Sequence, residues 1–272
     1  MRNWRWPALA SAILAIALLV HFVLPRSHVL FPPRASNGTD YVLYIHVPGA
    51  CRAGGCPALY LLDGERWLPT FARIVDERAR AHRMAPIVVV GIGYADILNT
   101  RARRKFDFTP AFDRAPSRTG GADAYHDVLT RELIPFAEAH LPIAPGARGI
   151  AGHSYGGLFA TYALMRAPDL FDRYLIMSPA LWFDEGKIYT QPFATAAAPR
   201  QVILAANTPQ NASSNMARDV MRLTDLLSQR ADLAVSRTMI LGANHNSMVT
   251  PAARRGLDAL YGPDVEGNRP PP

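Results

Sequence analysis

A glycine-rich pentapeptide near the middle of the chain has the spacing of a nucleophile turn. Residues 152–156 read Gly-His-Ser-Tyr-Gly, which fits G-x-S-x-G; an apolar stretch (149–151) precedes them and an apolar helical pattern (158–167) follows. On such a strand–turn–helix the serine hydroxyl stands clear of the sheet, and the glycines allow the backbone to double back. The pattern predicts that Ser154 is the nucleophile of an acyl transfer. The alternative is a glycine-rich turn with an ordinary serine.

A serine nucleophile needs a base, and His245 is the histidine best placed in the sequence. It lies in the loop 242–247, between the last predicted strand and the last predicted helix. In hydrolases with the chain order serine, acid, histidine, the base follows the acid in this way. His153 adjoins Ser154, but neighbouring side chains on a sharp turn are expected to point apart. We therefore predict His245 as the general base; a plain loop histidine is the alternative.

The acid of a triad is the member that the sequence does not supply clearly. The loop 207–212, where it is expected, holds no carboxylate, and the next one along the chain lies inside a predicted helix. Either Asp184 or Glu185 orients His245, or an amide such as that of Asn207 or a backbone carbonyl does. We favour a serine–histidine dyad, which should make an enzyme slow on unactivated substrates because the acid normally stabilises the imidazolium.

Two backbone N–H groups are candidates for an oxyanion hole. One belongs to Tyr155, the residue after the nucleophile, and the other to Gly64 in the loop after an early strand. A glycine lets its backbone approach a substrate closely. The alternative for Asp63-Gly64 is a simple turn.

The elements that must position these residues alternate between short apolar runs and amphipathic stretches. Strands that are apolar on both faces, alternating with helices, predict an α/β fold with a mostly parallel central sheet and helices on both faces. The predicted strands are 40–47, 58–62, 87–92, 148–153, 174–177, 202–206 and 235–241, and the predicted helices are 68–83, 122–140, 158–167, 215–229 and 250–260.

The N-terminal segment has the composition of an export signal. Residues 8–24 are apolar except for Ser11 and His21, and Arg2 and Arg5 precede them. No small-residue cleavage site follows the apolar run, so we predict an uncleaved membrane anchor, with the remaining chain on the periplasmic side of an inner membrane. Cleavage would give a secreted protein, and a buried helix is the further alternative. The predicted organisation is anchor 1–26, linker 27–39, catalytic domain 40–262 and disordered tail 263–272.

Cys51 and Cys56 agree with an oxidising compartment. They lie five positions apart in a glycine-rich loop, a pattern that predicts a small disulfide-closed loop, with two free thiols as the alternative. With no further cysteine nearby, a zinc site is not expected.

Composition excludes several classes of protein. The 272 residues are 49% hydrophobic and 19% charged, with 23 Pro and 19 Gly, which excludes collagen-like and wholly disordered chains. The net charge is +7, from 29 basic and 22 acidic residues. Basic blocks interleaved with aromatic residues are missing from the sequence, so we expect no nucleic-acid partner, whereas attraction of an anionic ligand remains compatible with the charge.

Six ordered motifs between about residues 38 and 262 resemble those of the esterase D-like putative esterases, and within that family the periplasmic trilactone siderophore (enterobactin and salmochelin) esterases. They are Leu-Tyr-Leu-Leu-Asp-Gly-Glu at 59–65, Arg-Lys-Phe-Asp-Phe-Thr-Pro at 104–110, Gly-Gly-Ala-Asp-Ala-Tyr at 120–125, Glu-Leu-Ile-Pro-Phe at 132–136, Gly-His-Ser-Tyr-Gly-Gly at 152–157 and Ser-Pro-Ala-Leu-Trp-Phe at 178–183.

This resemblance implies an α/β-hydrolase fold without a cofactor. It implies Ser154 and His245 as the catalytic pair, Tyr155 and Gly64 as oxyanion donors, and Arg104 as a contact for an anionic ligand. It also suggests Trp67 and Trp182 as pocket residues, although packing roles are an equal alternative for both. Where the family often has Glu after the 202–206 strand, this chain has Asn-Thr.

Three functions are therefore compatible with the sequence. The first is an exported serine esterase that cleaves the ester bonds of a small molecule such as an anionic ferric siderophore. The second is a carboxylesterase with another acyl-ester specificity, which sequence cannot separate from the first because fold does not determine substrate. The third is a ligand-binding protein with a decayed catalytic site.

Overall fold

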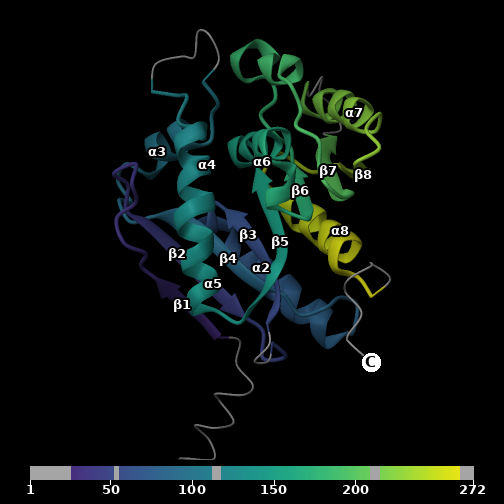
Figure 1. Ribbon diagram of the computed structural model, residues 1–272. Helices are drawn as coiled ribbons and strands as arrows, with labels where there is room; N and C mark the ends of the chain where they lie inside the picture. The colour runs from purple at the N-terminus through teal and green to yellow at the C-terminus, as the bar shows by residue number, and fades with distance from the viewer. Residues whose placement is uncertain (1–25, 52–54, 112–117, 209–214, 264–272) are drawn as a thin grey trace, which may run out of the picture.

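A single mixed sheet organises the computed structural model, which describes residues 26–51, 55–111, 118–208 and 215–263 (Figure 1). The sheet has eight strands in the order β1-β2-β4-β3-β5-β6-β7-β8. β2 pairs antiparallel with β1 and β4, and every other pairing is parallel. The strands are β1 (Arg26–Leu30), β2 (Tyr41–Val47), β3 (Cys56–Leu62), β4 (Val88–Tyr94), β5 (Ile143–His153), β6 (Arg173–Met177), β7 (Arg200–Thr208) and β8 (Leu233–Leu241).

Helices cover both faces of this sheet, as the sequence predicts (Figure 1). They are α2 (Gly64–Arg80), α3 (Thr100–Asp107), α4 (Ala122–Val128), α5 (Ile134–His140), α6 (Tyr155–Arg166), α7 (Asn215–Leu227) and α8 (Val249–Tyr261), with a π-helical turn at Leu129–Leu133 and 3₁₀ turns at Pro168–Leu170 and Phe183–Thr190. The mostly parallel α/β architecture is therefore confirmed.

Two apolar layers explain why the strands are hydrophobic on both faces. Leu59 and Leu61 of β3 pack with residues of α2 and α8, whereas Tyr60 and Leu62 of the same strand pack with residues of α4, α6 and α7. Side chains alternate across a strand, so a strand buried between two helical layers must be apolar at every position.

The N-terminal end of the described chain differs from the prediction. Residues 26–30 form β1, an edge strand, where the sequence predicts the last residue of the anchor and the start of a linker. Its sequence, Arg-Ser-His-Val-Leu, has little apolar periodicity. The strand forms because its backbone pairs along β2, from Arg26↔Val47 to Leu30↔Leu43, and such pairing does not need an apolar pattern. Helix α3 is likewise an element that the periodicity does not predict. The predicted anchor helix and most of the predicted tail lie outside the described residues, and no helix within those residues is long and apolar enough to cross a membrane.

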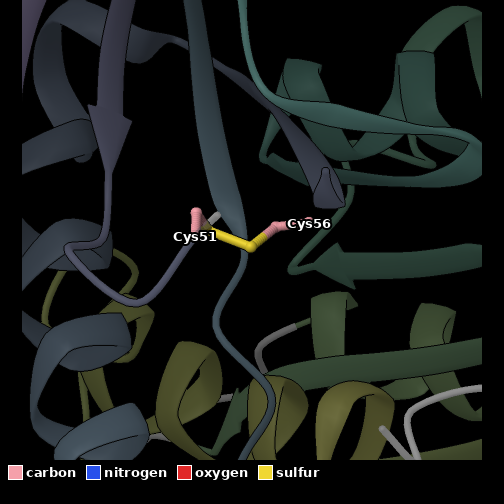
Figure 2. The surroundings of a disulfide bond; sticks show 2 residues. All are labelled: Cys51 and Cys56. Atoms are coloured by element: carbon pink, nitrogen blue, oxygen red, sulfur yellow. A yellow bond between two sulfur atoms is a disulfide. The ribbon is translucent and has the colours of Figure 1, made fainter. Parts of the chain in front are cut away.

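The predicted disulfide is confirmed. Cys51 and Cys56 are bonded, with their Cα atoms 5.6 Å apart (Figure 2). Cys56 is the first residue of β3, so the bond ties the loop after β2 to the start of β3. Within the described residues, no group of three or more His, Cys, Asp or Glu side chains is placed to hold a metal ion.

The parallel strands determine where chemistry can occur. The carboxyl ends of the parallel strands β3, β5, β7 and β8 all lie along the same edge of the sheet, perpendicular to the strands. The segments that follow these strands therefore start close to one another there. The segments after β3, β5 and β8 carry Gly64, Ser154 and His245, and Asn207 lies in β7 itself, next to its final residue. Arg26 lies at the opposite edge, because it pairs with Val47, the last residue of the antiparallel strand β2.

Candidate active site

Ser154 lies on a strained turn between β5 and α6. Its backbone has φ 61° and ψ −119°, a conformation that residues with a side chain rarely adopt. A Cβ atom added to Gly152 would come within 3.0 Å of the carbonyl group of Gly156, so the turn closes only if residue 152 has no side chain. The Ser154 N–H donates to the Met177 carbonyl (3.0 Å), and the Ser154 carbonyl accepts from Ala180 (3.0 Å). These contacts hold the serine on the sharp turn that the motif predicts.

The two predicted oxyanion donors are the first residues of helices. Gly64 begins α2 and Tyr155 begins α6, so no carbonyl group within the same helix accepts a hydrogen bond from either N–H. A Cβ atom on Gly64 would come within 3.0 Å of the Gly91 backbone in β4. Close packing of α2 on β4 therefore already requires this glycine. The participation of both N–H groups in catalysis stays a prediction.

The loop that carries His245 is held by polar contacts. The Asn244 side chain accepts hydrogen bonds from the N–H groups of Asn246 (3.0 Å) and Ser247 (2.8 Å). Arg66, in the first turn of α2, donates to the Asn246 side chain (3.0 Å). The His245 ring is half-buried, and its Nδ1 atom is buried with no hydrogen-bond partner in the described part of the chain. This is the atom that the acid of a triad would bind.

None of the candidate acids or orienters bonds to the His245 ring within the described residues. Asp184 faces Lys187 (3.2 Å), and Glu185 stands in a left-handed backbone conformation (φ 58°) beside it. Asn207 is buried; its Oδ1 accepts from the Ser178 hydroxyl (3.1 Å), and its Nδ2 donates to the Ala243 carbonyl (3.4 Å). Asn207 therefore orients the loop that carries His245 rather than the imidazole itself.

His153 contacts His245, and the sequence does not predict this contact. Its ring lies 4.3 Å from the His245 ring between centroids, and its Nε2 lies 2.8 Å from the His245 carbonyl oxygen. The nucleophile's neighbour thus touches the proposed base, although no hydrogen bond joins the Ser154 hydroxyl to His245 in the described structure. The expectation that the His153 and Ser154 side chains point apart says nothing of His245, and no pattern in the sequence signals the contact between the two histidines.

The Arg104 side chain is bound by other residues of the protein. Its guanidinium binds both carboxylate oxygens of Asp63, with Nη2 2.7 Å from Oδ2, and Nη2 also approaches the His153 carbonyl (3.3 Å). The Arg104 side chain is 22% exposed and that of Asp63 4%. This pair braces the turn beneath Ser154, and a contact between Arg104 and an anionic ligand stays a prediction.

The two predicted pocket tryptophans have different environments. Trp67 is 9% exposed; its ring meets His153 edge-on at 5.6 Å, and Arg66 covers it at 4.6 Å. Trp182 is 50% exposed and lies 5.9 Å from Tyr155. Trp67 is therefore packed among its neighbours, whereas the Trp182 ring is exposed beside Tyr155; a pocket role for either tryptophan stays a prediction.

The environment of His245 predicts the pH dependence of catalysis. Burial lowers the pKa of His245 below its ordinary value of 6.5, and the charges of Arg66 and Arg104 lower it further. A general base acts in its neutral form, so kcat/KM should rise with pH through a midpoint below 6.5. Steady-state rates on a nitrophenyl ester from about pH 4 to pH 8 measure this midpoint. Arg66→Gln should move it upward, and a wild-type midpoint above 6.5 would contradict the assignment.

Comparisons with known proteins agree with this geometry. The family model described as "Putative esterase" matches residues 35–232. The chain is 37% identical over 135 residues to a siderophore triacetylfusarinine C esterase of Aspergillus fumigatus (48% of this chain, 46% of the relative), so the match spans about half of that protein. It is 26% identical over 266 residues to the ferri-bacillibactin esterase BesA of Bacillus subtilis (89% and 92%). The crystal structure of the BES protein from Bacillus cereus superposes with a TM-score of 0.74 at 26% identity, covering 86% of this chain and 93% of that one.

Proposed function

The chain belongs to the putative esterase family, and from that premise we propose that it is an exported serine hydrolase that opens the ester bonds of a catecholate trilactone siderophore. The observation that carries the proposal is the meeting, at one edge of the sheet, of a serine on a strained turn, a histidine loop and two helix N-termini. The names of the relatives supply the substrate class, since those matched proteins are siderophore esterases.

The proposed reaction follows from these residues in two steps. His245 accepts the Ser154 proton as the serine oxygen attacks the ester carbonyl, and the N–H groups of Gly64 and Tyr155 bind the resulting oxyanion. The C–O bond to the alcohol breaks, and His245 returns the proton to the departing alkoxide. Water, deprotonated by His245, then attacks the acyl carbonyl. The C–O bond to Ser154 Oγ breaks, His245 returns the proton to Oγ, and the carboxylic acid is released.

The unpartnered Nδ1 of His245 limits this chemistry to favourable leaving groups. If no carboxylate outside the described residues binds Nδ1 either, the imidazolium that forms during attack lacks its usual stabilisation, and loss of that partner in a triad costs about 10⁴ in kcat. We therefore expect a slow enzyme whose substrates contribute binding energy through their other groups. The exposed ring of Trp182 beside Tyr155 offers a stacking surface for an aromatic group.

The test compares two esters. The full chain is incubated with a ferric tricatecholate trilactone and, separately, with nitrophenyl butyrate, and products are identified by mass; a sample inactivated by a fluorophosphonate gives the background. Opening of the trilactone with slow butyrate turnover supports the proposal. Fast butyrate turnover with an intact trilactone favours a general carboxylesterase. Binding of the trilactone without turnover of either ester, and without labelling of Ser154, favours a ligand-binding protein.

We also propose that residues 8–24 anchor the protein to the inner membrane, with the catalytic domain in the periplasm. Support comes from the apolar run and its flanking arginines. Support also comes from the strand register, because β1 begins at the sheet edge opposite Ser154 and an anchored domain would turn its site toward the aqueous phase. Alkaline extraction of membranes should leave the full chain in the pellet; release into the supernatant would overturn the anchor.

A further inference from the structure

His153 has contacts that the nucleophile turn does not require. The G-x-S-x-G pattern leaves the position before the serine open, yet this side chain is 2% exposed and lies between the rings of Trp67 and His245. It thereby joins α2, the end of β5 and the loop after β8. The His153 ring is therefore enclosed by α2 on one side and by the loop after β8 on the other.

The polarity of its hydrogen bond follows from the partner. The His245 carbonyl oxygen can only accept, so His153 must carry its proton on Nε2, 2.8 Å away. Burial first, and then the charge of His245, lowers the pKa of His153 to about 3, so the ring is neutral whenever the enzyme works near neutral pH. A neutral ring with Nε2–H also keeps a second positive charge away from His245 when that residue takes up the serine proton.

The loop that carries His245 has few other constraints from the body of the protein. Leu241, at its start, is 82% exposed. Asn207 holds the Ala243 carbonyl at 3.4 Å, and Arg66 holds the side chain of Asn246 at 3.0 Å. The Gly242 N–H also donates to the Thr208 carbonyl (3.0 Å). The bond from His153 is the shortest of these four contacts, ends on His245 itself, and comes from the residue covalently joined to Ser154.

We propose that His153 is a positioning residue that fixes His245 relative to Ser154 by holding its backbone carbonyl. In a triad the acid orients the base through its ring. Here the His153 hydrogen bond acts on the main chain of His245, and Nδ1 of the His245 ring has no partner among the residues that the structure describes. This inference rests on the proposed serine hydrolase function and explains how a dyad without an orienting acid keeps its geometry. Displacing a base by about 1 Å can cost about 10² in rate.

A pair of substitutions separates positioning from packing. His153→Phe keeps a ring against Trp67 but removes the donor, whereas His153→Gln carries an N–H near the position of Nε2. His126→Phe is the matched control, because His126 is also a buried histidine but its ring nitrogens have no hydrogen-bond partner in the described structure. All variants are made in the full chain and checked by thermal unfolding.

We expect His153→Phe to lower kcat on nitrophenyl butyrate by about 10²-fold with KM nearly unchanged, and to slow fluorophosphonate labelling of Ser154 in parallel. His153→Gln should recover most of the loss, and His126→Phe should leave kcat unchanged. An unchanged kcat in folded His153→Phe would overturn the proposal. So would an equal loss in folded His153→Gln, since the ring rather than the donor would then matter.

A second readout does not depend on turnover. Nitrogen-15 NMR of the histidine rings in the wild-type chain should show His153 neutral with its proton on Nε2, and His153→Phe should perturb the His245 signals while His126→Phe should not. A proton on Nδ1 of His153 would overturn the proposal. Absence of turnover and labelling in the wild type, with the Nε2–H signal present, would instead refute the proposed function while leaving the contact intact.

Discussion

Replacing Ser154 by alanine should lower kcat for ester hydrolysis by at least about 10³-fold and leave thermal unfolding nearly unchanged. The nucleophile supplies the acyl-enzyme route, and its loss in triad hydrolases costs about 10⁶ in kcat. We expect a smaller loss here because no acid among the described residues binds His245 Nδ1. The backbone of residue 154 has φ 61°, which is as strained for alanine as for serine, so stability should not change much.

The companion variants test whether Ser154 and His245 act as one unit. His245→Ala should cause a loss of similar size, and the double variant should be no slower than either single variant, because residues of a catalytic unit are strongly non-additive. Rates are measured on nitrophenyl butyrate and on the trilactone, with Ser154 labelling as a further readout. Full activity in Ser154→Ala would refute the assignment of the nucleophile.

Breaking the Asp63–Arg104 pair should be among the most destabilising changes at this edge of the sheet. Arg104→Met leaves the Asp63 carboxylate buried without its cation, and Asp63→Asn leaves the guanidinium without its anion. Removing one partner of a buried pair costs about 3–5 kcal/mol in the free energy of unfolding. The pair also braces the nucleophile turn through the His153 carbonyl, so activity should fall together with stability.

The double variant Asp63→Asn/Arg104→Met separates the structural role of Arg104 from a ligand contact. It should be more stable than the sum of the single losses predicts, since no buried charge is left unpaired. Urea unfolding measures the three free energies, and KM for an anionic and a neutral ester is compared in the double variant. A rise in KM confined to the anionic ester would show that Arg104 also contacts the substrate; strictly additive losses would contradict the importance of the pair.

The sequence alone predicts the parts of this protein that depend on neighbouring residues. The twelve predicted elements from 40–47 to 250–260 correspond to observed strands and helices, with ends that differ by a few residues. Hydrophobic periodicity carries this information because each strand and helix must present its apolar side chains to a layer. The glycines at 152 and 156 and the short separation of Cys51 and Cys56 are likewise local, and the turn and the disulfide form as predicted.

The edge strand β1 and helix α3 mark the limit of local information. Neither has clear apolar periodicity: β1 obtains its hydrogen bonds from β2, and α3 is rich in arginine. The arginines of α3 look in sequence like a solvated cluster or a ligand-binding patch. Arg103 instead pairs with Asp107 (2.9 Å), and Arg104 with Asp63. Charge counts along a chain cannot reveal which charges the fold pairs with each other.

What only the tertiary structure decided is how distant residues meet at the catalytic edge. His153 and His245 are 92 positions apart, Arg66 and Asn246 180 positions, and Asp63 and Arg104 41 positions. Nothing in the sequence near any of these residues specifies its partner, because these contacts exist only after β3, β5 and β8 align in one sheet. Motif spacing therefore determined that Ser154 stands on a nucleophile turn. The packing of α2, β5 and the loop after β8 decided that His153 holds the backbone of His245, whose Nδ1 has no partner within the described part of the chain.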